Sequence, residues 1–328
     1  MGIRASQVTL APVRIPFAVP PPGSRPFDVV GFGLNSIDLI AVVAEFPRSN
    51  TRQRLQRFAR LPGGQIAASV VTCAKLGWRA RYVGSFGSDH LGVMARESLT
   101  AEGVDIAAAR TVPGATNQFA MILVDARSGE RTVLWDCHPA LNMDPDDVPR
   151  DAVTSARLLI VDCQQTPASA RAARHARQAG VPTIVDVEKV RPGIADLLQT
   201  ADAIIAAEEF PSALTGHEDL GRALQVIGRD SGASVVCVTL GEAGSLAWCN
   251  GREIRTRPFQ VDCVDSSGAG DAFRGGFAAA CLGMAGGDIE DVLIYANAVA
   301  ALNCRALGSR GGLPTAAEVE SLLVNSKV

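Results

Sequence analysis

The stretch DSSGAGDAF, residues 265–273, decides how this sequence is interpreted. It places Gly268 and Gly270 before Asp271, and an apolar segment follows. Apolar residues in that segment recur at helical spacing, at Phe273, Phe277, Cys281 and Met284. The stretch therefore predicts a glycine-rich loop that leads into a helix, with Asp271 in the first turn.

Such a loop can hold an anion. The N–H groups of a first helical turn have no intrahelical partner, and the helix dipole adds partial positive charge there. Glycines let phosphate oxygens approach the backbone, and an Asp at the same place can deprotonate an attacking hydroxyl in phosphoryl transfer. The alternative is an ordinary glycine-rich turn whose Asp interacts only with the dipole. For the loop taken alone, this alternative is the stronger interpretation.

The composition is that of an ordinary globular protein. The 328 residues are 47% hydrophobic with a formal net charge of −3, so one large domain or two smaller ones can form. We expect no attraction to nucleic acid or to an anionic membrane. No apolar run is long enough to span a membrane, and the N-terminus lacks the apolar core of a signal peptide. We expect a cytoplasmic protein.

The eight cysteines are scattered along the chain, and no pair has CxxC spacing. No histidine lies at ligand spacing from a cysteine pair. We therefore expect free thiols in a reducing compartment and no zinc site.

Short β-branched apolar runs alternate with helical patterns from residue 27 onward. The runs predict strands at 27–34, 80–87, 156–163, 182–188, 202–209 and 234–241. The helical patterns fall at 65–76, 91–103, 167–179, 217–230, 271–285, 288–303 and 314–324. Near-continuous hydrophobicity suits parallel strands covered on both faces, so the predicted fold class is α/β, a doubly wound and mostly parallel sheet flanked by helices.

Three further regions complete the predicted organisation. Segments 39–61 and 117–136 resemble strands joined by turns, and we expect them to form a small antiparallel sheet that serves as a lid over the site, as a dimer interface, or as both together. Residues 1–26 are proline-rich and predict an N-terminal extension that is mobile or packed on the surface. The main domain then spans residues 27–324, and 325–328 form a short tail.

Three motifs in order give this chain a family resemblance. VDSSGAGDAFRGGF (264–277) is similar to the C-terminal motif of the PfkB, or ribokinase-like, carbohydrate kinases. PGGQIAASVVTCAKLGWRARYVGSFGSDHLG (62–92) resembles their N-terminal motif, and VTLGEAGSLAW (238–248) resembles their nucleotide-site strand and turn. The resemblance covers residues 27–324 and is greatest to the ketohexokinase and sulfofructose-kinase branches. It implies a ribokinase-like fold and an ATP- and Mg²⁺-dependent sugar kinase.

The resemblance also implies roles for individual residues. Asp271 matches the catalytic base, and the anion hole matches Gly268, Ala269 and Gly270. Sugar hydroxyls would be bound by Asp38, with Gly63 and Gly64 letting the sugar lie against the backbone. The nucleotide-site positions are Thr239, Gly241 and Gly244 for phosphates and ribose, and Ala296, Asn297 and Ala300 for adenine. For the last three, an ordinary helix packing face is the alternative.

The chain departs from the family pattern at several positions. Gln65 stands where the family often has Asn, so the sugar contact there is longer or is moved to Asn35. The N-x-x-E motif linked to magnesium and phosphate is missing, and Glu208 is the acid that could compensate. Asp186 and Glu188 could position metal-bound water or phosphate, or could belong to a solvated loop. The resemblance implies that Asp265 lies beside a monovalent cation such as K⁺.

The predicted function is transfer of the γ-phosphoryl group of ATP to a primary hydroxyl of a ketohexose or pentose, by a homodimer joined through the small sheet. An anionic sugar remains open because arginines lie in the lid segments, at 52, 54, 57 and 131. A sugar- or nucleotide-sensing protein on the same fold is the alternative. A nucleotide-linked oxidoreductase is weaker, because GFGLNS (31–36) lacks the third glycine of a dinucleotide loop.

Overall fold

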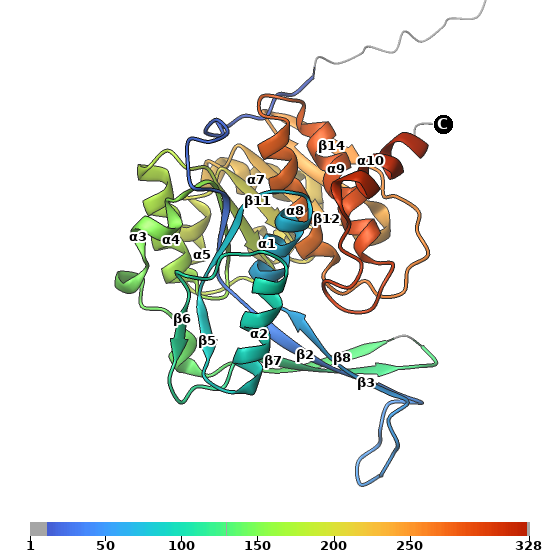
Figure 1. Cartoon of the computed structure of the whole chain (residues 1–328). Helices are drawn as coiled ribbons and strands as arrows, with labels where there is room; N and C mark the ends of the chain where they lie inside the picture. The colour runs from blue at the N-terminus through green and yellow to red at the C-terminus, as the bar shows by residue number, and fades with distance from the viewer. Residues whose placement is uncertain (1–11, 129, 327–328) are drawn as a thin grey trace, which may run out of the picture.

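A computed structural model describes residues 12–128 and 130–326; residues 1–11, 129 and 327–328 lie outside the description. The centre of the fold is an eight-stranded sheet (Figure 1). Its strands lie in the order β14 (Arg252–Thr256), β13 (Ser245–Cys249), β12 (Val235–Thr239), β11 (Ala203–Ala206), β10 (Thr183–Val187), β9 (Ala156–Asp162), β1 (Phe27–Phe32) and β4 (Ala80–Val83). From β12 to β4 every pairing is parallel, and β13 and β14 add an antiparallel edge.

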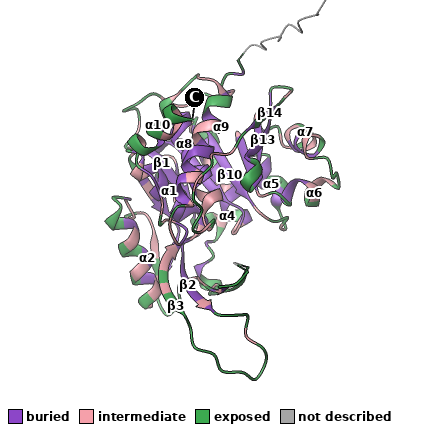
Figure 2. Cartoon of the chain, turned by 90° about the vertical axis from the view of Figure 1, so that its right-hand side faces the viewer, coloured by how far each residue is buried: buried purple, intermediate pink, exposed green. Residues whose placement is uncertain are grey.

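Helices cover both faces of this sheet, which confirms the predicted fold class. In β9, Leu158 and Ile160 pack with α1 (Gln65–Lys75), α8 (Ala269–Gly283) and α9 (Ile289–Asn303), whereas Leu159 and Val161 face the opposite layer. Alternate residues of one strand thus serve two cores, which is why the strand sequences are almost wholly apolar. Figure 2 shows the buried strands between the two helical layers. The second layer contains α3 (Arg150–Val153), α4 (Thr166–Gln178), α5 (Ile194–Leu198), α6 (Phe210–Thr215) and α7 (Leu220–Ser231).

The remaining elements are peripheral. Helix α2 (His90–Ala101) packs on the short pair β5 (Ser85–Gly87) and β6 (Arg110–Val112), so the predicted strand 80–87 is split between two sheets. Helix α10 (Ala316–Asn325) packs on α9 and begins with a capping box at Thr315. No helix within the described ranges is long and apolar enough to cross a membrane.

The small sheet is present and projects from the main body (Figure 1). Its strand order is β3 (Arg57–Gly63), β2 (Ser36–Val43), β7 (Phe119–Asp125) and β8 (Arg131–Asp136). β2–β3 and β7–β8 are antiparallel, as expected, but the central β2–β7 pairing is parallel. Each hairpin contributes its first strand to the centre, and these two strands run in the same direction.

The described part of the N-terminal extension packs against the main domain. Val13 and Ile15 are buried. The Ile15 N–H donates to the Gly287 carbonyl at 2.9 Å, and the Ile289 N–H donates to the Val13 carbonyl at 2.8 Å. The apolar side chains of Val13 and Ile15 therefore cover the turn before α9.

Replacing Gly275 with Ala is expected to destabilise the fold by about 1–3 kcal/mol, because α1 and α8 approach closely there. A methyl group at Gly275 would collide with Thr72 and lie 2.7 Å from the Ser69 carbonyl oxygen. Gly283→Ala in the same helix is the control, since its new Cβ would meet Trp78 at an ordinary 3.4 Å. Urea unfolding measures both variants. Equal stability of the two would contradict this packing argument.

Candidate active site

The DSSGAGDAF stretch forms a loop followed by α8. The helix begins at Ala269 and has Gly268 as its N-cap, with a φ of 72° that favours glycine. A side chain at Gly268 would also collide with the Ser309 carbonyl. The Ala269 N–H donates to the Ser266 carbonyl at 3.2 Å. Gly270 and Asp271 therefore supply first-turn N–H groups that helix geometry leaves for an anion.

Asp265 fixes the start of this loop. Its Oδ1 accepts from the Ser267 N–H at 2.8 Å, and its Oδ2 accepts from the Gly308 N–H at 2.8 Å. Burial alone would raise the pKa of Asp265, but these backbone donors hold it below the usual value. The ionised carboxylate thus joins the loop before α8 to the loop after α9.

Asp271 lies in the first turn of α8 with a side chain that is 13% exposed. Burial raises the pKa of Asp271 to about 7, and the nearby Arg274 opposes this rise. Glu188 and Asp38 raise it further, and Arg310 lowers it. A carboxyl group with a pKa near neutrality is suited to accept a proton at physiological pH.

Arg274 is a residue of this site that the sequence interpretation missed. It donates to Asp271 at 2.7 Å and lies 2.6 Å from Asp186. Asp186, expected beside metal-bound water or phosphate, is fully buried in this ion pair. Burial raises the pKa of Asp186 well above its ordinary value, and Arg274 opposes the rise. The Asp186 carboxylate therefore faces a guanidinium group.

On the proposed sugar side, Asp38 projects from β2. Its carboxylate accepts from the Ser36 hydroxyl at 3.1 Å and from the Ser309 hydroxyl at 2.9 Å. Burial raises the pKa of Asp38, and the two hydrogen bonds oppose this rise. A side chain at Gly63 would collide with this carboxylate, and one at Gly64 would collide with the backbone at residue 35. Both glycines are thus required by close approach.

Gln65 and Asn35 differ in what they can offer a ligand. The Gln65 Oε1 accepts from Gln164 at 2.9 Å, while its Nε2 is buried without a partner among the described residues. Asn35 donates to the Tyr82 hydroxyl at 2.8 Å and to the Ser85 carbonyl, and accepts from Asn117. Gln65 therefore has a donor to spare, whereas the Asn35 side chain is used within the fold.

A cavity of about 380 Å³ lies next to the N-terminus of α8. Most predicted nucleotide and anion-hole residues line it: Thr239, Gly241, Gly244, Ala269, Gly270, Asn297 and Ala300. Ala296 does not, because it is fully buried against Gly276. The Asn297 amide donates to Thr256 at 2.8 Å and so is partly used inside the fold. The sequence interpretation missed the wall formed by residues 258–261 with Cys263 and Cys304.

Candidate metal ligands are sparse. No group of three or more His, Cys, Asp or Glu side chains that could hold a metal occurs within residues 12–128 and 130–326. Glu188 is half-buried and close enough to Asp271 to raise its pKa, and Glu208 is exposed at the end of β11. These acids fit an ion that is held mainly by water and phosphate oxygens.

Arg131 brings the small sheet into contact with the loop of residues 265–270, which we call the anion loop. Its guanidinium donates to the Ser267 hydroxyl at 2.8 Å and lies 3.8 Å from Asp265. The other lid arginines, at 52, 54 and 57, are exposed. Of the predicted lid cations, Arg131 is therefore the one with a contact at the site among the described residues.

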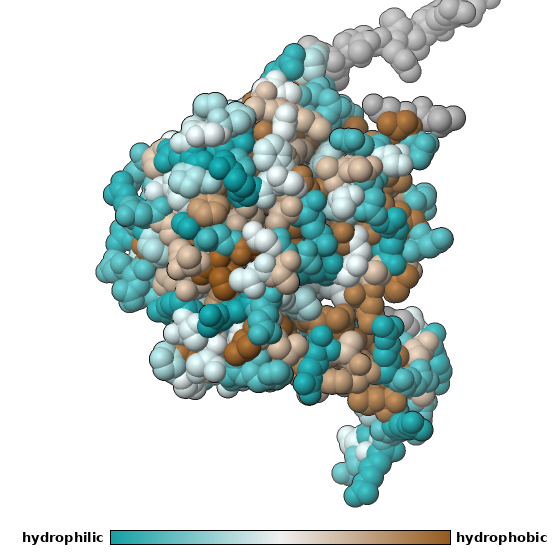
Figure 3. Space-filling view, in the orientation of Figure 1, coloured by the Kyte–Doolittle hydropathy of each residue, from teal (hydrophilic) through white to brown (hydrophobic). Residues whose placement is uncertain are grey.

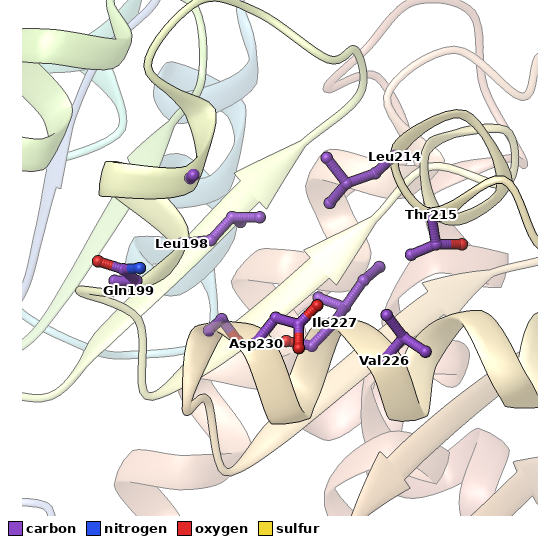
Figure 4. A pocket seen from close by; sticks show the side chains of 9 residues that line it. Leu198, Gln199, Leu214, Thr215, Val226, Ile227 and Asp230 are labelled. Atoms are coloured by element: carbon purple, nitrogen blue, oxygen red, sulfur yellow. Dashed lines mark hydrogen bonds between the residues drawn. The ribbon is translucent and has the colours of Figure 1, made fainter.

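A second cavity, of about 300 Å³, lies between α5, α6 and α7 (Figure 4). Leu198, Leu214 and Ile227 contribute apolar walls, and Asp230 is the ionisable side chain among its lining residues. Asp230 pairs with Arg229 at 2.7 Å. Neither the loop of residues 265–270 nor Asp38 nor Asp271 lines this cavity, so the α8 site is the candidate active site.

Ala300→Leu is expected to fill part of the 380 Å³ cavity and to weaken ATP binding at least about tenfold, because nucleotide pockets tolerate little lost volume. Folding should be kept, since Ala300 is only partly buried. Ala296→Leu is the contrasting variant and should lower the melting temperature, because that site is fully packed. Calorimetric ATP titration and thermal unfolding separate the two effects. Unchanged ATP affinity in Ala300→Leu would show that adenine lies elsewhere.

Comparison with known proteins gives the family. Residues 27–316 match the pfkB family carbohydrate kinase domain. The chain is similar to the ATP-dependent ribose-1-phosphate kinase of Halopiger xanaduensis, with 30% identity over 298 residues, 90% of this chain and 97% of that protein. It is 26% identical to the ribokinase of Bacillus subtilis over 297 residues, 89% of this chain and 97% of that protein. Arabidopsis thaliana ribokinase, solved with ribose and ATP, superposes with a TM-score of 0.80 at 25% identity, covering 90% of this chain and 98% of that one. A family match over most of the chain, together with the fold, shows that this chain belongs to the PfkB family of carbohydrate kinases.

Proposed function

We propose that this protein transfers the γ-phosphoryl group of ATP to a primary hydroxyl of a pentose or ketohexose, with Asp271 as the base. The observation that carries the proposal is the position of Asp271. It stands at the N-terminus of α8, which forms a wall of the nucleotide cavity. Asp38 lies near enough on the other side to raise the pKa of Asp271.

The mechanism follows from these groups. Asp38 accepts hydrogen bonds from sugar hydroxyls, and the Gln65 amide donates one. The Asp271 carboxylate accepts the proton of the attacking sugar hydroxyl. At the same time the hydroxyl oxygen forms a bond to the γ-phosphorus, and the bond between the γ-phosphorus and the leaving ADP oxygen breaks. The N–H groups of Gly270 and Asp271 stabilise the charge on the transferring phosphoryl group. The small sheet excludes water from the sugar, which limits ATP hydrolysis.

Two ions belong to this proposal. Mg²⁺ would be held by ATP phosphates and by waters that reach Glu188, with Glu208 further out, and it would neutralise phosphate charge. Asp186 does not fit as a ligand, because it is buried in an ion pair with Arg274. A monovalent cation such as K⁺ would lie beside Asp265, whose carboxylate joins the loop before α8 to the loop after α9.

The sugar is proposed from the relatives. The curated relatives include ribokinase and ribose-1-phosphate kinase, so both neutral and anionic pentoses are candidates. Arg131 at the anion loop supports tolerance of an anionic group.

Dimerisation through the small sheet is part of the proposal. Large apolar side chains are exposed on it, with Trp135 at 63% and Leu134 at 55%, beside Phe58, Met121 and Val133. Figure 3 shows hydrophobic surface along this sheet. Exposed apolar side chains gathered on one sheet favour a partner, and a second copy of the chain would cover them. The free cysteines support a reducing cytoplasm as the location.

ADP release from Mg-ATP should depend on one sugar of a panel that contains ribose, fructose, ribose 1-phosphate, fructose 1-phosphate, sulfofructose, a 2-keto-3-deoxy sugar acid and adenosine. Asp271→Asn should lower kcat by about 10²–10⁴-fold through loss of the base, with ATP binding retained. A coupled assay measures turnover, and calorimetry measures ATP binding.

Two outcomes would contradict the proposal. Near-full turnover of Asp271→Asn would remove Asp271 as the base. Binding of ATP and a sugar without turnover by the wild-type protein would favour the alternative, a sensing protein.

Activity is expected to rise with pH through about 7. Below that pH the Asp271 carboxyl, whose pKa burial raises to about 7, is protonated and cannot accept the hydroxyl proton. The pH profile of kcat at saturating ATP and sugar measures this. A profile that is already flat from pH 5 upward would contradict the assignment.

A further inference from the structure

Helix α8 contains a buried cation that the proposed mechanism does not yet use. Arg274 follows Asp271 by one helical turn, and its side chain is 3% exposed. Nη1 donates to Asp271 Oδ1 at 2.7 Å, and Nη2 lies 2.6 Å from Asp186 Oδ1. One guanidinium therefore bridges the proposed base and a second carboxylate, which comes from β10.

A purely structural ion pair elsewhere in the chain looks different. Arg157 is 1% exposed, and its Nη1 lies 3.2 Å from Asp28. Its Nε donates to the Pro20 carbonyl at 2.7 Å and its Nη2 to the Leu282 carbonyl, so it ties three chain segments together. Arg274 has a buried Nε without a partner among the described residues. Its polar contacts among the described residues are the carboxylates of Asp271 and Asp186.

The arrangement fixes the base and leaves it accessible. In the cluster, Asp186 is 0% exposed and Arg274 3%, whereas Asp271 is 13% exposed. Arg274 occupies Oδ1 of Asp271, so Oδ2 is the oxygen left for a hydroxyl. Helix packing fixes the backbone beneath them, because a Cβ at Gly275 would collide with Thr72 of α1.

Asp186 changes how strongly the positive charge of Arg274 acts on Asp271. A guanidinium paired with Asp271 alone would neutralise the carboxylate and weaken it as a base. A second carboxylate on the same guanidinium shares its positive charge, so Arg274 neutralises Asp271 less completely. Three further charged groups act on Asp271: Glu188 after β10, Asp38 on β2 and Arg310 in the loop after α9.

We propose that Arg274, itself fixed by Asp186, is the positioning residue of the base and directs Asp271 Oδ2 toward the attacking hydroxyl. Asp186 is then the counter-ion of Arg274 and not a metal ligand. This inference rests on the proposed kinase function.

The test replaces the pair with apolar side chains of similar size, as Arg274→Met with Asp186→Leu. Removing both members of a buried ion pair together leaves stability near the wild-type value or above it. We expect kcat to fall by about 10²-fold, because the base is no longer held in place. KM for ATP and for the sugar should change by less than about threefold, since neither binding site is altered. Arg274→Lys, which keeps a cation, should recover part of kcat.

Arg157→Met is the matched control. It breaks a buried ion pair far from the cavity, so the melting temperature should fall while kcat of the folded protein stays within about twofold. A double variant at Arg274 and Asp186 whose kcat equals that of the wild type would overturn the proposal. A fall in kcat that is fully explained by a loss of stability would also overturn the proposal.

A second readout does not depend on turnover. Carboxyl ¹³C NMR of Asp-labelled protein follows the titration of Asp271, which is assigned with Asp271→Asn. The pKa of Asp271 should rise in Arg274→Met, which loses the cation, and fall in Asp186→Asn, where Arg274 serves Asp271 alone. An identical titration in all three proteins would overturn the proposal. If the wild type phosphorylates no sugar, the kinase function fails, and this titration still tests the coupling of Arg274 to Asp271.

Discussion

Burial of the Asp271 carboxylate at the N-terminus of α8 is the constraint on which the site depends, because the proposed mechanism requires this group to accept and release a proton. Burial raises the pKa of Asp271 to about 7, and the nearby Arg274 opposes this rise. The same helix terminus also lines the cavity of about 380 Å³, so in the proposed mechanism one turn of helix serves both the base and the phosphoryl group.

The loop after α9 links the two halves of the site. The Gly308 N–H holds Asp265, at the start of the anion loop. The neighbouring Ser309 hydroxyl donates to Asp38, which belongs to β2 of the small sheet. Gly308 and Ser309, two adjacent residues, thus fix the position of Asp38 relative to the anion loop. Arg131 adds a second link from the small sheet, through the Ser267 hydroxyl. The small sheet is therefore connected by hydrogen bonds to both sides of the site.

Local patterns in the sequence predicted most of the fold, because continuous apolar runs and helical spacing are local signals. The β13–β14 hairpin was missed, although Asn250–Gly251, with φ of 49° and 78°, is a favoured hairpin turn. The contact of Arg274 with Asp186 could not be predicted, because residues far apart in sequence meet only through the packing of α8 on the sheet. The prediction that Ala296 lines the cavity differs from the structure, because the sequence of a helix made of small apolar residues does not show which of its faces is packed.

Proton-coupled ³¹P NMR of the product tests most directly whether Asp271 delivers a primary hydroxyl to ATP. The protein is incubated with Mg-ATP and the sugar that supports ADP release, and Asp271→Asn is treated in parallel. We predict a new phosphomonoester signal split into a triplet by the two protons of a primary carbon, formed by the wild type and almost absent with Asp271→Asn. A doublet from a secondary carbon, a signal from inorganic phosphate alone, or equal product from Asp271→Asn would contradict this account.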